Sequence, residues 1–411
     1  MKNYLLTACF LCFTFVLNAQ NNRILFDATK AETAGNADWI IDADSHNLGY
    51  DSGPAGVGQG NESNAQRIPT PDQSGITQST PEDYWNGALS YWGIDLVKKG
   101  YKVETLPYNG SITYNNSSNA QDLKNYKVFI VCEPNIVFST AEKTAIIQFV
   151  QHGGGLFVVS DHDNSDRNND GWDSPHIWND LMDNNSIQND PFGFTFDYVS
   201  FSQTTTNVAN LPNDPLLHGI MGNVTKAMWS AGTSMTLNPT SNTSVKGVIY
   251  KTGSSIGNNN AMVAYATYGQ GKVVGIGDSS PCDDGSGDSN DQLYDGWISD
   301  AGGNHEKLII NACIWLATDS SVGVPETAES GNPYKIASNP VKDYLVIEPS
   351  GLSNGLTDIM IIDLSGKKIL ERKFESNETF CLPVGSFAPG CYLYRIKDNS
   401  QKIFSGKFIK L

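Results

Sequence analysis

The chain has 411 residues, enough for two or three domains with sizeable cores. A charged fraction of 17% beside a hydrophobic fraction of 39% excludes an intrinsically disordered chain. Residues 20–334 hold 15 basic and 36 acidic residues, a net charge of −21, whereas residues 335–411 carry +3. The acidic part repels polyanions unless divalent cations intervene, which argues against nucleic acid as a partner. Acidity of this kind also keeps exported proteins soluble, and that simpler interpretation stays open.

The first 19 residues have the pattern of a signal peptide. Lys2 precedes an apolar core from Tyr4 to Leu17, and Ala19 offers a small residue at the cleavage site. A lipoprotein signal that ends at Cys9 is the alternative, but too few apolar residues precede that cysteine. No later apolar run is long enough to span a bilayer, so no transmembrane segment is expected after signal cleavage.

Residues 23–317 alternate between short apolar runs and helical patterns. In the clearest unit, Ser139 and Glu142 have the spacing of a capping box, glycines at 153–155 stop the helix, and 156–159 are all apolar. Such alternation predicts an α/β fold with a doubly wound, mostly parallel sheet. Further strands are expected at 23–27, 102–106, 128–132 and 271–277, and further helices at 80–100 and 304–317.

The last quarter of the chain has a different composition. Residues 318–334 are rich in Ser, Thr, Glu, Pro and Gly, as in a linker, and the remainder has the alternating runs of a small all-β sandwich. The sequence leaves open whether Cys381 and Cys391 pair there. The expected organisation is a signal peptide (1–19), an α/β domain (20–317), a linker (318–334) and a C-terminal β-sandwich (335–411).

Residues 335–411 resemble the C-terminal sorting domain of type IX secretion cargo. The resemblance lies in Asn339-Pro340-Val341 before a strand, Pro389-Gly390-Cys391-Tyr392-Leu393 before a later strand, and the ending Lys407–Leu411. It implies export through the periplasm and across the outer membrane by the type IX secretion machinery. The protein would then be released or attached to the cell surface. The alternative is an ordinary carbohydrate-binding-like sandwich.

Residues 23–317 resemble the class I glutamine amidotransferase-like superfamily in layout. The resemblance rests on the helix–Gly-Gly-Gly–strand unit at 139–159 and the run GQGKVVGIGD at 269–278. It implies a flavodoxin-like α/β domain. Where the glutaminases of that family carry their cysteine, this chain has Ser160-Asp161-His162, and where they carry their histidine it has Asp278. Glutaminase activity is therefore not expected.

Acidic residues follow four of the expected strands. Because the carboxyl ends of parallel strands meet at one edge of a sheet, where open α/β sheets bind ligands, these acids are expected to gather there. Crowded carboxylates repel one another unless a proton or a cation neutralises them, and oxygen-rich clusters suit Ca²⁺, Mg²⁺ or Mn²⁺. The alternative is that single acids cap helices and hold loops. The expected catalytic residues are Asp161, His162, Asp163 and Asp278, and Glu32 and Asp283 are expected cation ligands beside Asp27, Glu133 and Asp284.

The segment after Asp163 resembles half of a calcium loop. Asp166, Asn168 and Asp170 stand at positions one, three and five, and a glycine stands at position six. Position twelve is an isoleucine rather than a bidentate acid, and Asp173 or Asp180 is the expected substitute. The cofactor expected from this pattern is a divalent cation, Ca²⁺ first. The alternative is a metal-free loop of Asx turns.

Three functional hypotheses fit these patterns. The first is an exported α/β domain that binds, or binds and hydrolyses, an extracellular polysaccharide or similar polar substrate at a metal-supported acidic site. The second is a metal-dependent phosphoesterase or nuclease, and the third is a surface module without catalysis. Tryptophans near the loop edge could stack on sugar rings, although tryptophan is more often part of a core. These tryptophans are Trp39, Trp85, Trp172, Trp178 and Trp297, and His152, His176, His218 and His305 are interpreted as helix-end or packing residues.

Overall fold

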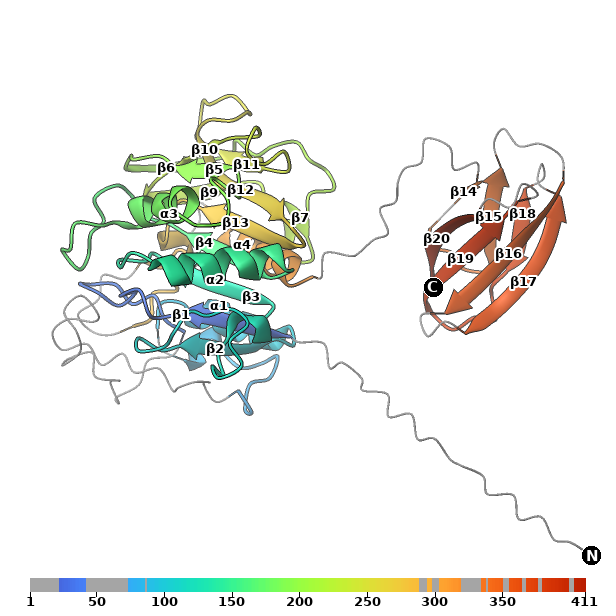
Figure 1. Cartoon of the computed structure of the whole chain (residues 1–411), viewed down its shortest axis with the longest axis horizontal. Coiled ribbons are helices and arrows are strands. Elements are labelled where there is room, and N and C mark those ends of the chain that lie inside the picture. The colour runs from blue at the N-terminus through green and yellow to red at the C-terminus, as the bar shows by residue number, and fades with distance from the viewer. Residues whose placement is uncertain are drawn as a thin grey trace, which may run out of the picture. The chain divides into compact units, whose positions relative to one another are not determined.

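The computed structural model describes two compact units, within residues 1–320 and 321–411 (Figure 1). The expected signal peptide and nearly all of the expected linker lie outside the described residues. No helix among the described residues is both long and apolar enough to cross a bilayer. The described residues are 22–41, 73–85, 87–287, 294–297, 303–318, 334–337, 339–349, 355–363, 367–375, 379–398 and 403–411.

A nine-stranded mixed sheet organises the described part of the first unit. One half consists of five parallel strands in the order β2 (Lys102–Leu106), β1 (Arg23–Asp27), β3 (Val128–Cys132), β4 (Gly155–Val159) and β13 (Gly271–Ile276). The other half is antiparallel and continues with β12 (Ala261–Tyr268), β10 (Met235–Leu237) and β5 (Phe194–Phe196), with β11 (Lys246–Tyr250) beside β12. Two small ribbons accompany the sheet, β6 (Phe201–Thr205) with β9 (Ala227–Gly232) and β7 (His218–Gly219) with β8 (Gly222–Asn223).

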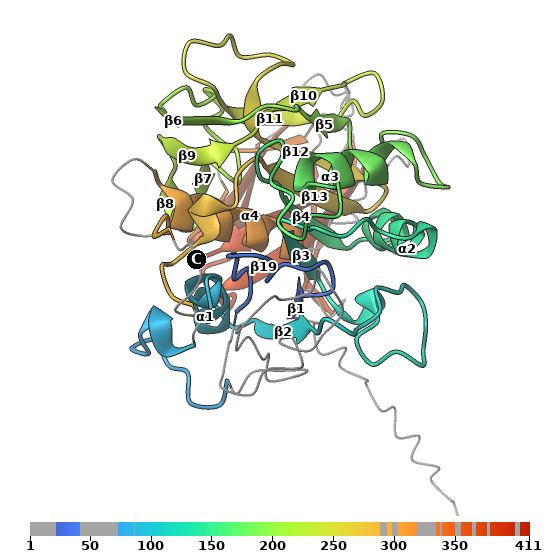
Figure 2. The ribbon, with the colours of Figure 1, turned by 90° about the vertical axis from the view of Figure 1, so that its left-hand side faces the viewer.

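Helices cover both faces of this sheet. In Figure 2, α1 (Ser90–Lys98) and α4 (His305–Ala317) lie on one side of the strands, and α2 (Thr140–Gln151) and α3 (Ser174–Asp183) on the other. Successive residues of β4 alternate between the two hydrophobic cores, because side chains of a strand point to opposite faces. The expected strands are thus confirmed as parts of a large mixed sheet. The expectation that this sheet is doubly wound stays a prediction.

The capping box expected at α2 is present. The Glu142 backbone N–H donates to Ser139 Oγ at 3.3 Å, and the Ser139 N–H donates to the Glu142 carboxylate at 2.7 Å. Beyond the helix the chain packs tightly, since a Cβ at Gly271 would come within 2.0 Å of the Val150 carbonyl oxygen. Gly271, the first residue of β13, therefore lets this strand approach the end of α2.

The helix expected from residue 80 to residue 100 begins only at Ser90. Before it, Glu82–Tyr84 form a separate 3₁₀ turn, η2. The reason is tertiary, because the N–H groups of Ala88 and Leu89 donate to carbonyls of Asp38 and Ile40 instead of forming helical bonds. The Pro-Glu-Asp start signal is thus real, but it opens a single turn.

The C-terminal unit consists of two antiparallel sheets around one core. One sheet is β14 (Tyr334–Ile336), β15 (Tyr344–Pro349) and β18 (Phe380–Pro383); the other is β17 (Lys368–Glu375), β16 (Leu356–Asp363), β19 (Gly390–Lys397) and β20 (Ile403–Lys410). This is the sandwich-like all-β unit expected. Cys381 lies in the first sheet and Cys391 in the second, and both are free thiols.

Candidate functional site at the carboxyl edge of the parallel strands

Three parallel strands deliver acids to one edge of the sheet. Cys132, Val159 and Ile276 are in register at the carboxyl ends of β3, β4 and β13. The chain continues from these ends to Glu133, Asp161 and Asp278, and all three carboxyl groups are buried. Glu133 adopts a left-handed backbone conformation with φ of +47°, which costs a non-glycine residue on the order of 1 kcal/mol. The edge is thus both acidic and conformationally unusual.

Arg167 is the centre of this acidic group. Its guanidinium donates to Glu133 Oε1, to Asp161 Oδ2 at 3.1 Å and to Asn36 Oδ1 at 3.0 Å. Its backbone N–H donates to Asn135 Oδ1 at 3.1 Å. A planar guanidinium can contact several acceptors at once, which an ammonium cannot do in the same geometry. Arg167 therefore supplies the positive charge for Glu133 and Asp161, and it fixes the loop that follows β4.

Burial dominates the titration of the neighbouring acids. Burial raises the pKa of Asp161 well above its usual range, and the charges of Glu133 and Asp278 raise it further while Arg167 opposes them. Burial also raises the pKa of Asp278 to about 7, although the N–H groups of Ser280 and Ser230 bond to its carboxylate. Burial therefore favours the protonated form of both carboxyl groups, and little of their surface is open to a substrate.

Asp27 and Glu32 form a second acidic group where β1 ends. Both are buried, and each has a carboxyl oxygen that accepts a backbone N–H: Thr29 N to Asp27 Oδ1 at 3.2 Å, and Lys30 N to Glu32 Oε2 at 2.7 Å. Burial raises the pKa of Asp27 to about 6, and burial followed by the charge of Asp27 raises that of Glu32 well above normal. The two groups lie within hydrogen-bonding reach of each other.

Asp283 and Asp284 follow the 3₁₀ turn η4 (Ser280–Cys282) and hold loops. Asp283 accepts the N–H groups of Gly285 and Tyr294 at 2.8 and 2.7 Å. Asp284 accepts the N–H of Tyr91, in the first turn of α1, at 2.7 Å. Burial raises the pKa of each to about 7. The structure thus engages Asp283, expected as a cation ligand, in loop-holding hydrogen bonds.

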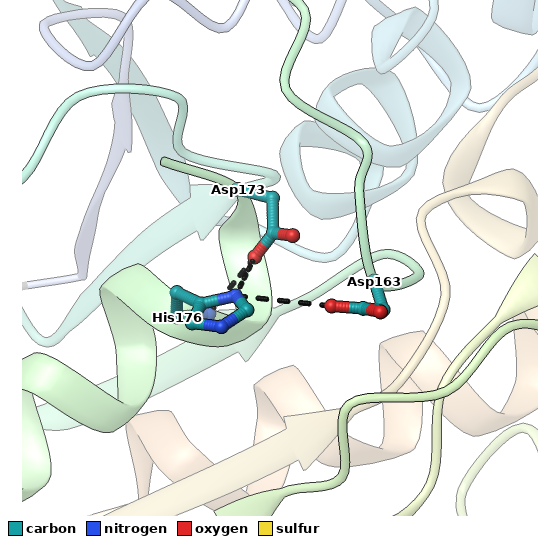
Figure 3. A group of neighbouring side chains, drawn as sticks. All are labelled: Asp163, Asp173 and His176. Atoms are coloured by element: carbon teal, nitrogen blue, oxygen red, sulfur yellow. Dashed lines mark hydrogen bonds and ion pairs between the residues drawn. The ribbon is translucent and has the colours of Figure 1, made fainter. Parts of the chain in front are cut away.

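Asp163, Asp173 and His176 converge at the start of α3 (Figure 3). His176 Nδ1 lies 2.6 Å from Asp173 Oδ1 and 3.9 Å from Asp163 Oδ1, and one ligand atom from each residue lies within 4.8 Å of the others. Asp173 is the N-cap of α3, followed by Ser174-Pro175, so the helix begins there for a local reason. The side chains of Asp163 and His176 are partly exposed, which leaves the group open to solvent.

An exposed aromatic surface adjoins this group. The rings of His176 and Tyr198 stack at 3.9 Å between centroids with an interplanar angle of 8°. Tyr198 is 52% exposed and Trp172, one residue before Asp173, is 39% exposed. The other tryptophans named at the loop edge are buried, so for them the interpretation as core residues holds rather than stacking on a ligand: Trp39, Trp85, Trp178 and Trp297.

His162 has a defined orientation beside the same acids. Its Nδ1 lies 2.7 Å from the Asp163 carbonyl oxygen, so Nδ1 carries the proton in that contact, and Nε2 lies 3.9 Å from Asp161 Oδ2. The ring is partly exposed. An imidazole held through Nδ1–H has Nε2 available to accept a proton.

The calcium-like loop is closed by its own hydrogen bonds. Asp166 accepts the N–H groups of Asp170 and Gly171 at 3.1 and 2.8 Å, and Asp170 accepts that of Trp172 at 2.9 Å. Asn168 donates to the Asn135 carbonyl oxygen at 2.7 Å. The contact of Asp170 with the Trp172 N–H is an Asx turn, and together these bonds hold the three expected ligands in one small, partly exposed loop beside Arg167.

Two residues of this site were not expected to take part. Arg167 lies between loop residues in the sequence, and nothing local indicates that it reaches strand ends more than 30 positions away. His176 does have a local signal, since a histidine three residues after an N-cap aspartate points back to the cap. A surface hollow of about 590 Å³ also lies beside α2, but none of its lining residues is an acid. They are Ile112, Thr113, Tyr114, Asn116, Thr140, Ala141, Thr144, Ala145 and Gln148.

The comparisons with known proteins identify only the C-terminal unit. Residues 335–410 match the family model of the secretion system C-terminal sorting domain. The chain is therefore exported by the type IX system, to the medium or to the cell surface, and its C-terminal unit interacts with that machinery. No curated protein matches the chain at a significant level.

Among solved structures, the likenesses are distant. The mmIFT52 N-terminal domain shares 13% identity at a TM-score of 0.39, covering 59% of this chain and 96% of its own. The cytoplasmic protein STM3548 from Salmonella typhimurium shares 12% identity at 0.32, covering 54% and 83%. A DUF3244 family protein with an immunoglobulin-like β-sandwich fold, from Bacteroides vulgatus, shares 16% identity at 0.18, covering 19% and 85%. No functional statement about this chain rests on them.

Proposed function

We propose that the N-terminal unit of this exported protein binds an extracellular polar ligand, of which a polysaccharide is the main example, with a divalent cation held by Asp163, Asp173 and His176. The observation that carries the proposal is the convergence of three ligand atoms within 4.8 Å of one another at a partly exposed position. Two carboxylates and one imidazole suit Zn²⁺ or Mn²⁺ better than Ca²⁺, which prefers oxygen ligands. The metal at this position would therefore differ from the Ca²⁺ expected at the loop of Asp166, Asn168 and Asp170.

The aromatic surface supports a sugar as the ligand. Tyr198, stacked on His176, and Trp172, next to Asp173 in the chain, have exposed, flat, amphipathic side chains, and such rings combine apolar contact with a polar group that can hydrogen-bond. A sugar ring offers C–H groups on its faces and hydroxyls at its rim. The hydroxyls would bind the cation while the faces pack on the aromatic rings.

Metal content of the purified protein tests the cation. After chelation and reconstitution, the wild type is expected to retain about one Zn²⁺ or Mn²⁺, and His176→Gln to lose it. His218→Gln is the matched control, because His218 is an exposed histidine on β7. A purely structural role, in which Asp173 caps α3 and orients His176, gives equal metal content in all three proteins and would refute the site.

Hydrolysis of the bound ligand is a second candidate function, favoured by His162. With Nδ1 directed to a carbonyl oxygen and the ring partly exposed, Nε2 is placed to take a proton from a water molecule. A panel of glycosides and phosphoesters would reveal an activity, and His162→Gln is expected to lower it by about 10²-fold or more. Equal turnover by wild type and His162→Gln would leave ligand binding alone.

We also propose that residues 23–317 share the doubly wound layout of the class I glutamine amidotransferase-like superfamily without its chemistry. The support for the missing chemistry is that the turn after β4 carries Ser160 in place of a cysteine, and that Cys132, at the end of the neighbouring strand β3, is buried. Glutamine is expected to release no ammonia, whether or not the thiols are alkylated. Release that alkylation abolishes would contradict this.

A further inference from the structure

The turn after β1 contains a group of buried oxygens without hydrogen-bond donors. Asp27 Oδ2, Thr29 Oγ1, Glu32 Oε1 and Thr33 Oγ1 accept or donate no hydrogen bond in the described part of the chain. The four residues are between 1% and 8% exposed. Buried polar atoms are almost always paired, because an unpaired one costs about 1–3 kcal/mol. Four of them within seven residues indicate that something absent from the chain itself completes the group.

The rest of the turn fixes these oxygens in place. One oxygen of each carboxyl group is held by a backbone N–H, that of Thr29 for Asp27 and that of Lys30 for Glu32. The remaining two carboxyl oxygens belong to groups within hydrogen-bonding reach of each other. Ala31, between them, adopts a left-handed conformation with φ of +57°. A cluster that the backbone holds so closely is organised before any ligand enters.

The charge of Lys30 lowers the pKa of Asp27, but by less than burial raises it, so the described charges balance this pair only in part. The Lys30 ammonium itself donates to Glu142 Oε1 at 2.7 Å and lies over the ring of Phe138. On the other side, the neighbouring strand end carries Cys132 and Glu133, and Arg167 is bound to Glu133 and Asp161. Two facing carboxylates removed from water are destabilising unless further positive charge balances them.

The geometry points to a calcium ion bound between Asp27 and Glu32, with the hydroxyls of Thr29 and Thr33 as further oxygen ligands. Ca²⁺ takes oxygen ligands in flexible geometry, and its two charges balance two carboxylates. Mg²⁺ gives up its water reluctantly and suits a buried site less. This site differs in residues and in ligand type from the one at Asp163, Asp173 and His176, and it does not depend on the proposed function.

Calcium binding by calorimetry, on the chelator-treated full chain, tests the site. The wild type is expected to bind Ca²⁺, and Glu32→Gln is expected to weaken that binding at least tenfold. Asp95→Asn is the matched control, since Asp95 is likewise a buried acid, on α1, whose pKa burial raises. Asp95→Asn and His176→Gln are expected to retain the wild-type affinity.

Several results would contradict a calcium site between Asp27 and Glu32. Absence of Ca²⁺ binding by the wild type, or equal affinity in wild type and Glu32→Gln, overturns the proposal and leaves a pair of carboxyl groups that share a proton. Loss of the same binding event in Asp170→Ala assigns the ion to the loop of residues 166–171 and also overturns it. Should Glu32→Gln not fold, Thr33→Val removes one hydroxyl at nearly constant shape. It is expected to weaken Ca²⁺ severalfold, with recovery in Thr33→Ser, and unchanged affinity in Thr33→Val would then count against the site.

Discussion

Two groups of buried acids at the same edge of the sheet differ in the positive charge that the chain provides for them. Glu133 and Asp161 face a guanidinium from the chain itself, that of Arg167. Asp27 and Glu32 face each other, and the ammonium of Lys30, whose charge acts on Asp27, is bound to Glu142. The comparison teaches that an acid-rich strand edge does not predict a metal site by itself. What matters is whether the fold brings a cationic side chain to the acids.

The largest expected loss of stability comes from removing the guanidinium of Arg167. Arg167→Met leaves Glu133 and Asp161 buried without their partner, and breaking a buried ion pair in this way costs about 3–5 kcal/mol. Denaturant unfolding of the N-terminal unit measures the loss. Arg167→Lys is the control, because it keeps the charge and loses the planar geometry, so an intermediate loss is expected. A stability of Arg167→Met within about 1 kcal/mol of the wild type would show that the ion pairs are not needed.

Besides a guanidinium or a metal cation, a proton can neutralise a buried acid, and Asp284 tests this case. Burial raises the pKa of Asp284 to about 7, above the value of about 3.9 in an unfolded chain. The folded state therefore binds the extra proton, and this contribution to stability is complete below pH 4 and lost as the pH rises through 7. One pKa unit corresponds to about 1.4 kcal/mol, so the change approaches roughly 4 kcal/mol at most.

The measurement for Asp284 is a difference between two proteins. Asp284→Asn cannot ionise, so its stability relative to the wild type is expected to improve steadily from pH 4 to pH 8. Thermal unfolding across that range gives the trend, and Asp183→Asn, at an exposed position on α3, is the matched control. A constant difference between Asp284→Asn and the wild type over the whole range would contradict the raised pKa.

The sequence predicts those parts of the fold that depend on neighbours in the chain. The apolar runs at 23–27, 102–106 and 128–132 coincide with β1, β2 and β3, and the capping box at Ser139 is present. The start of α1 could not be predicted in the same way, because its position depends on bonds from Ala88 and Leu89 to carbonyls near residue 40.

The candidate site likewise has some features that local sequence predicts and others that it does not. The order of strands and the acids after them indicate which edge to inspect, and Asp161 and Asp278 do lie there. Their neutralisation by Arg167, the burial of Trp39 and Trp85, and the meeting of Asp163 with His176 are contacts between distant segments. Local spacing carries no information about such contacts.

The loop of residues 166–171 extends the comparison to acids outside the buried groups, since Asp170 is exposed and Asp166 is partly exposed. If it binds Ca²⁺, a hundredfold excess over Kd adds about 2.7 kcal/mol of stability. The melting temperature would rise by about 2–4 °C for each kcal/mol, and Asp170→Ala would remove most of the rise. Asp183→Asn again serves as the control. An equal response of wild type and Asp170→Ala to Ca²⁺ and chelator would identify the loop as a set of Asx turns, in keeping with its internal hydrogen bonds.

The smallest expected effect concerns Glu142, the carboxylate that binds the Lys30 ammonium. Glu142 accepts both the Ser139 N–H and the Lys30 ammonium at 2.7 Å. Glu142→Gln keeps a side chain that suits a capping box and loses the charge, so the stability cost is expected to be about 0.5–1 kcal/mol. The freed ammonium can then turn towards Asp27 and compete with a cation there, which lowers calcium affinity severalfold.

Ser139→Ala separates the two roles of Glu142. It removes the cap, at a cost of about 1 kcal/mol, but leaves the contact between Glu142 and Lys30 in place. Chemical denaturation should therefore show both variants slightly destabilised, while calcium titration should distinguish them, with only Glu142→Gln weakened. If both variants bind calcium as the wild type does, the pairing of Lys30 has no influence on Asp27 and Glu32. The contrast between an acid pair neutralised by its own chain and one left to a cation would then have to rest on Arg167 alone.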